Sequence, residues 1–362
     1  MEFTHKTTKA GIHRLLWFLQ VKDMRMKVHI FNPETDYALG CTGGNYIPPA
    51  TVVRLRQSMS LFPATYAKPG DAILLLDKIS EDELSESAYI DMARSKCLRV
   101  VSLGNGYNEL LDIPDTSSER RIEIFPWGWN HTLRNLLLRH GFPAELLKSE
   151  EEIENIRTIA HRRTTIPFLK GISRLMPGLD IRIPKEFLNV EEALSFANDD
   201  PGCYFKMPWS SSGRGVICAA GMSQQKLTEW LRGAVARQGS VLGEHGYDRA
   251  ADFATEWCCT DGNARFVGYS WFDTGSNGRY IGNQHLSQAE IKTKIKEVAS
   301  GFSDDIIQAQ KNVIERLIAP YYDGPMGIDM LADIEGRINP CVEINLRMTM
   351  GMATILGIRN EE

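Results

Sequence analysis

The sequence has no long apolar segment, no long basic block and no internal repeat. No stretch approaches the roughly 18 apolar residues that a transmembrane helix requires, so we expect no membrane partner. The formal net charge is −5, and without a basic cluster there is no bulk attraction to nucleic acid. These absences argue against a membrane protein and against a protein that binds nucleic acid through charge.

The spacing of the cysteines indicates neither a metal site nor a set of disulfides. None of the seven forms a C-x-x-C pair, and several lie in apolar runs. This favours reduced, buried thiols and a cytoplasmic protein. Hydrophobic residues make up 43% and charged residues 24% of the chain, which is ordinary for a soluble globular protein. A chain of 362 residues is long enough for about two or three domains with cores of their own.

Two glycine-containing segments lack the complete patterns of common nucleotide sites. Gly104-Asn-Gly106 has no third glycine at the spacing of a dinucleotide fingerprint, which argues against NAD. The serine- and glycine-rich segment 210–215 lacks the order of a P-loop, and it joins a strand to a strand.

The N-terminal part predicts an extension followed by an open α/β domain. Residues 1–25 contain a short apolar run without a small-residue cleavage site, so we interpret them as an extension or a loosely attached helix. Apolar strands are expected at 27–31, 71–76 and 98–103, with helical segments between them. Ligands of such sheets bind beyond the carboxyl ends of the strands.

Polar residues follow the first expected strand and are candidates for substrate binding. They are Asn32, Glu34, Asp36 and Asn45. The alternative is that Asn and Asp residues here only form turns.

The most informative stretch covers residues 326–347. Near its end, Glu343, Asn345 and Arg347 alternate with apolar residues. In a strand, alternate side chains share one face. One face therefore enters a core, and the other presents a carboxylate, an amide and a guanidinium in a row.

A second alternating run precedes it, with Asp329 among apolar residues and a turn near Gly336. The pair predicts a β-hairpin in which Asp329 lies across from Glu343. Two carboxylates and the Asn345 amide are hard oxygen ligands, so Mg²⁺ or Mn²⁺ is the expected metal. The alternative is a sheet with one solvated face.

Upstream, an apolar run ends at Lys206 and a flexible loop follows. Short hydroxylated residues and glycines let backbone N–H groups converge on phosphate oxygens, and the lysine adds a point charge. The candidate phosphate contacts are Lys206, Ser210, Ser211, Ser212, Gly213 and Gly215. Taken alone, such a loop is weak evidence, because most loops of this composition are plain turns.

In this order, these features resemble the ATP-grasp superfamily of carboxylate–amine and carboxylate–thiol ligases. The resemblance covers about residues 150–355 and adds Glu244, in a segment that matches the hinge of that superfamily. It implies an α+β fold of two subdomains with ATP held between them, preceded by an α/β domain that helps to hold the acceptor substrate.

The resemblance also implies residue roles. Adenine would meet the hinge from Glu244 to Tyr247, and Arg347 would face a reacting acyl phosphate. An earlier basic contact to phosphate is expected near 162–163; we assign it to Arg163, with Arg162 as the alternative. Arg279 is a candidate for phosphate or substrate carboxylate, or else a surface charge.

The expected organisation is an extension (1–25), an α/β domain (26–130), connecting helices (131–165), a lid subdomain (166–242) and a C-terminal subdomain with the metal site (243–362). The expected reaction joins a small-molecule carboxylate to an amine through an acyl phosphate, with ATP and Mg²⁺ as cofactors. Phosphoryl transfer to another acceptor, and a nucleotide-binding regulatory module without turnover, remain alternatives, and a homodimer is an open possibility.

Overall fold

The computed structural model describes residues 25–41, 43–104, 106–111, 121–211, 213–275 and 280–361. The predicted extension therefore lies outside the described residues except for Arg25, which begins the first strand. Ser212 and Arg279 also lie outside them. None of the helices in this part of the chain combines the length and apolar character that a membrane crossing requires.

The N-terminal domain is an open parallel sheet with the strand order β3-β2-β1-β4. Its strands are β1 (Arg25–Ile30), β2 (Ala72–Leu75), β3 (Arg99–Ser102) and β4 (Arg121–Pro126). The helical segments are α2 (Thr35–Leu39), α3 (Ala50–Ser58), η2 (Phe62–Thr65), α4 (Glu81–Ser85), α5 (Ile90–Ser95), α6 (Gly106–Leu111) and α7 (His131–Arg139). The predicted α/β class is confirmed.

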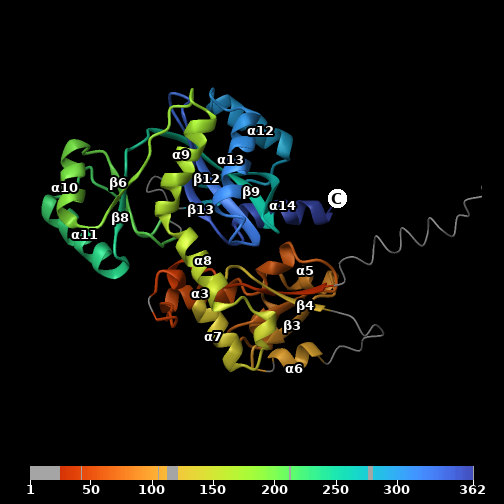
Figure 1. Cartoon of the computed structure of the whole chain (residues 1–362). Coiled ribbons are helices and arrows are strands. Elements are labelled where there is room, and N and C mark those ends of the chain that lie inside the picture. The colour runs from red at the N-terminus through yellow and green to blue at the C-terminus, as the bar shows by residue number, and fades with distance from the viewer. Residues whose placement is uncertain are drawn as a thin grey trace, which may run out of the picture.

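The lid is a small antiparallel sheet with the order β5-β8-β6-β7. Its strands are β5 (Lys185–Phe187), β6 (Tyr204–Lys206), β7 (Val216–Cys218) and β8 (Val241–Glu244). Two helices, α10 (Val190–Asp199) and α11 (Gln224–Gln238), share its apolar core. In Figure 1 this green unit stands apart from the blue C-terminal sheet, with the orange N-terminal domain below.

The C-terminal subdomain is a five-stranded antiparallel sheet with the order β11-β10-β9-β12-β13. Its strands are β9 (Arg249–Thr260), β10 (Asn263–Thr274), β11 (Tyr280–Asn283), β12 (Gly324–Asp333) and β13 (Ile338–Asn345). The helices around it are α9 (Thr165–Leu175), α12 (Gln288–Val298), α13 (Asp304–Leu317) and α14 (Met350–Glu361). Its apolar core includes Trp257 and Phe253, which are both fully buried.

The segments that connect the three parts of the chain are helical. Between α7 and α9 lie η3 (Ala144–Leu146) and α8 (Glu150–Ala160), and Ser149 caps α8. The segment after β1 contains α2. Helix α7 contributes Leu137 to the core of the N-terminal sheet and is part of that domain. Helix α9, placed in the lid by the 166 boundary, instead packs with α13 in the C-terminal core.

The expected hairpin of the C-terminal subdomain is confirmed. Strands β12 and β13 are antiparallel, and Asp329 pairs with Glu343. Gly336, in the connecting turn, has a φ of 78°, a conformation that glycine adopts without strain. A β-bulge follows Asp329, so the pairing register of the two strands near the turn differs from their register at the open end of the hairpin. The two carboxylates nevertheless lie on the regular part of the ladder.

Candidate active site

The structure contains a cavity of about 940 Å³ to which all three parts of the chain contribute. The lid supplies residues of β6, β7 and β8, and the C-terminal sheet supplies residues of all five of its strands. The N-terminal domain supplies residues that follow β1 and β4. Nine of the sixteen candidate residues that the structure describes line this cavity.

The acidic residues of the hairpin lie together on the face that lines the cavity. Asp329, Glu343 and Asn345 all border it. Asp329 pairs directly with Glu343, while Gly327 pairs with Asn345. Burial, together with the neighbouring Glu343 carboxylate, raises the pKa of Asp329 well above its ordinary value. A bound cation would relieve this electrostatic cost.

The donor set suits a magnesium ion shared with phosphates better than a closed metal site. Within the described part of the chain, no group of three or more His, Cys, Asp and Glu side chains is arranged to hold a metal by itself. Two carboxylates and one amide oxygen leave coordination positions open. Mg²⁺ commonly uses one or two carboxylates and completes its octahedron with water and substrate phosphate oxygens.

A buried arginine from the segment before α9 reaches one of these carboxylates. Arg162 donates to the Oε1 of Glu343 at 2.7 Å and to the Oγ of Ser210 at 2.6 Å. Its side chain is 4% exposed. Arg163, the residue assigned from the sequence, is exposed, and no contact ties it to the cavity. The geometry therefore favours Arg162, the alternative, as the basic group at the phosphates.

Arg347 joins the hairpin to the N-terminal domain. It donates through Nε to the Oδ2 of Asp36 at 2.8 Å and through a terminal nitrogen to the Oδ1 of Asn345, also at 2.8 Å. Burial raises the pKa of Asp36, and the arginine opposes that shift. The guanidinium thus connects the candidate metal-ligand row with helix α2.

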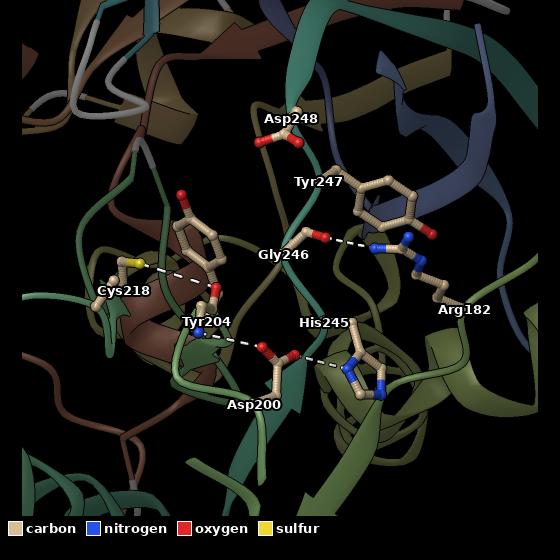
Figure 2. A pocket seen from close by; sticks show the side chains of 10 residues that line it. Arg182, Asp200, Tyr204, Cys218, His245, Gly246, Tyr247 and Asp248 are labelled. Atoms are coloured by element: carbon tan, nitrogen blue, oxygen red, sulfur yellow. Dashed lines mark hydrogen bonds and ion pairs between the residues drawn. The ribbon is translucent and has the colours of Figure 1, made fainter. Parts of the chain in front are cut away.

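Lys206 ends β6 inside the cavity, where its Nζ lies 2.5 Å from the Oε2 of Glu244. The backbone beyond Glu244 crosses between the lid and the C-terminal sheet. Figure 2 shows how this crossing is held: Arg182 donates to the carbonyl of Gly246 at 2.6 Å and stacks over Tyr247, 4.8 Å from the ring centroid. These contacts give the expected adenine end a defined shape.

The serine- and glycine-rich loop begins with a buried Ser210, and Ser211 and Gly213 line the cavity. Gly213 and Gly215 have φ values of 72° and 73°. A side chain at Gly215 would also strike Ser210, 2.9 Å from its Cβ. The loop therefore needs glycine at 215 for conformation and for close approach.

The candidates of the N-terminal domain have different surroundings. Only Asp36 reaches the hairpin. Asn32 is buried and donates to the carbonyl of Gly128 at 2.8 Å, so it joins the two loops that follow β1 and β4. Glu34 is paired with Arg56. Asn45 is exposed and does not line the cavity.

Glu256 lines the cavity as well, although no motif in the sequence singled it out. It lies on β9, is 1% exposed, and pairs in register with Gly327 of β12. Burial raises its pKa to about 7. The available signal was a single carboxylate within the largely apolar run 253–259.

Neither a family profile nor a curated protein matches the chain. Solved structures do. A biotin carboxylase–β,γ-ATP complex from Campylobacter jejuni has a TM-score of 0.50 at 12% identity, with 94% of this chain and 72% of that chain covered. A phosphoribosylamine–glycine ligase from Thermotoga maritima has a TM-score of 0.50 at 13% identity, with 93% and 73% covered.

Both neighbours are ATP-grasp proteins. The chain therefore has the ATP-grasp fold, and its resemblance to that superfamily is confirmed at the level of the fold. At such low identity the likeness does not extend to substrates.

Proposed function

We propose that this protein is an ATP- and Mg²⁺-dependent ligase that joins a carboxylate to an amine and releases ADP and phosphate. The observation that carries the proposal is the convergence of the Asp329–Glu343–Asn345 row with Lys206 and Arg347 on one cavity. The structural neighbours include proteins named as carboxylases and ligases, which supports the same reaction class.

The nucleotide would bind between the lid and the C-terminal sheet. Its adenine would lie at the crossing from Glu244 to Tyr247, and its phosphates near Lys206, Arg162 and the loop at 210–215. Mg²⁺ or Mn²⁺, held by the hairpin row, would neutralise charge on the phosphoryl oxygens during transfer. Binding would require Arg162 to exchange its bond with Glu343 for bonds with phosphate.

In the first step, a carboxylate oxygen of the substrate attacks the γ-phosphorus, and the bond to the ADP oxygen breaks. Arg347 lies where it can stabilise the acyl phosphate that results. In the second step, the amine nitrogen attacks the acyl carbon, the bond to the phosphate oxygen breaks, and the nitrogen loses a proton. Closure of the loop at 210–215 would keep water away from the intermediate.

Hydroxylamine provides the test, because it is small and can replace the natural amine. A panel of carboxylates is incubated with the protein, ATP, Mg²⁺ and hydroxylamine. We expect ATP-dependent hydroxamate with ADP as the coproduct. AMP and pyrophosphate would indicate adenylation and contradict the mechanism. Tight ATP binding without turnover over the whole panel would favour a regulatory module, and transfer of phosphate to a hydroxyl would favour a phosphotransferase.

A further inference from the structure

One end of the cavity, formed by residues of the N-terminal domain and the start of α14, has an apolar wall. It is lined by Phe31, Leu55, Met59, Trp127 and Met350. Leu55 is 46% exposed although it is a large apolar residue. When a ligand covers an apolar side chain that lines a cavity and is this exposed, removal of its surface from water favours binding.

This wall is backed by a packed core. Phe31 and Trp127 lie edge to face with ring centroids 5.2 Å apart. The backbone N–H of Trp127 donates to the carbonyl of Ile30 at 2.7 Å, and the carbonyl of Trp127 accepts from Met348 at 2.8 Å. The two large rings are therefore held by the sheet on one side and by the end of the hairpin on the other. The shape of this end exists before any ligand arrives.

One carboxylate, Glu256, borders the same end. Its Oε1 accepts from Ser270 at 2.9 Å, and its Oε2 accepts from Thr349 at 2.8 Å. A Cβ at Gly351 would lie 2.2 Å from Oε1, and one at Gly327 would lie 2.9 Å from Oε2. Two glycines and two hydroxyl groups thus hold the carboxylate in one position.

The partners of the Glu256 carboxylate differ from those of its acidic neighbours. Asp36 is paired with Arg347, and Glu343 is paired with Arg162. Glu256 forms no ion pair with any basic side chain that the structure describes, and its partners are neutral hydroxyls. A buried carboxylate whose hydrogen-bond partners are neutral hydroxyls is stabilised by a nearby cation and destabilised by a nearby anion.

We infer that this end of the cavity binds a primary amine that carries an aliphatic or aromatic group, with its ammonium directed to Glu256 and its apolar group against Leu55 and Trp127. The assignment of this ligand as the second substrate rests on the proposed ligase reaction. The other substrate, a carboxylate, belongs beside Arg347, whose guanidinium is positively charged.

Binding can be tested without turnover by calorimetric titration of the whole protein in the presence of ATP and Mg²⁺. The probes are 3-methylbutylamine and three matched compounds: 3-methylbutanol without charge, 4-methylpentanoate with the opposite charge, and ethanolamine without the apolar group. We expect 3-methylbutylamine to bind about tenfold more tightly than the alcohol or ethanolamine. Tightest binding of the carboxylate, or equal binding of ethanolamine, would overturn the inference.

Two variants locate the site. Glu256→Gln keeps the shape and should remove the preference for the amine over the alcohol. Leu55→Asn should weaken both ligands that carry the apolar group. Leu188→Asn is the control, because Leu188 is 69% exposed and does not line the cavity. An unchanged amine preference in Glu256→Gln would contradict the role of this carboxylate.

The outcome can be separated from that of the ligase test. Hydroxamate formation without a preference for apolar amines would leave the ligase proposal standing and remove this inference. Amine binding that depends on Glu256, with no hydroxamate from any carboxylate, would support the amine site and contradict the ligase proposal.

Discussion

The two ends of the cavity hold their charges in different ways. At the nucleotide end, basic groups are paired with acidic ones: Lys206 with Glu244, and Arg162 with Glu343. At the apolar end, Glu256 accepts hydrogen bonds from hydroxyl groups, and the surrounding wall is apolar. The first arrangement suits a ligand that carries both phosphates and a metal, because both members of each pair find new partners. The second suits a ligand with one positive charge and an apolar body.

The largest effect is expected from the metal row. Glu343→Gln and Asp329→Asn should each reduce Mg²⁺-dependent ADP release by more than the roughly 10–100-fold typical of outer-shell changes at metal sites, because each removes a proposed ligand. Glu335→Gln in the turn of the same hairpin is the control, since its side chain is 64% exposed. Near-normal turnover in both ligand variants would remove the metal assignment.

The pair Arg162→Ala and Arg163→Ala distinguishes two neighbouring arginines. Arg162→Ala leaves Glu343 without its cation. Breaking a buried ion pair in this way should lower the free energy of unfolding by about 3–5 kcal/mol at most. Arg163→Ala should change the free energy of unfolding by no more than about 0.5 kcal/mol, because Arg163 is exposed. Urea denaturation measures both values. Equal effects in the two variants would mean that the ion pair contributes nothing to stability.

Lys206→Ala tests the phosphate contact. A lost charge-assisted contact is worth about 1.5–3 kcal/mol, so ATP should bind roughly ten- to a hundredfold more weakly. Adenosine has no phosphates and should be affected much less. Calorimetry with both ligands makes the comparison, and Lys185→Ala on the exposed start of β5 is the matched control. Equal losses for ATP and adenosine would contradict the role.

The smallest expected effect is the pH dependence of stability at Glu256. Burial raises its pKa from 4.5 to about 7 in the folded state. Between these two values the folded protein binds more protons than the unfolded chain, so this group's contribution to stability falls as the pH rises. Glutamine does not titrate, so the Glu256→Gln variant does not lose stability through this group as the pH rises.

The free energy of unfolding of Glu256→Gln, relative to the unmodified protein, should therefore increase by on the order of 1–3 kcal/mol from pH 5 to pH 8. Denaturation curves at both values measure it. A difference that does not change with pH would show that Glu256 titrates normally, and the contrast between the two ends of the cavity would then weaken.

Local sequence pattern determined much of the fold and of the candidate site. Alternation of apolar and polar residues around Asp329 and Glu343, with a glycine turn between them, was sufficient to predict the hairpin and the pairing of the two carboxylates, because strand period and turn geometry act over a few residues. Three of the four parallel strands of the N-terminal domain were likewise indicated by short apolar runs, whereas β4 was not predicted. The order of lysine, loop and hairpin carried the resemblance to the ATP-grasp superfamily.

Tertiary structure decided which distant groups meet. Arg162 and Glu343 are 181 positions apart, and Asp36 and Arg347 are 311 positions apart. Neighbouring residues such as Arg162 and Arg163 have the same chemistry in the sequence, and only packing selects the one that faces the cavity. Glu256 acquires its unusual environment because Gly327, Ser270 and the start of α14 come together around it. Such contacts depend on how the sheets and helices pack against one another, and no local periodicity encodes that packing.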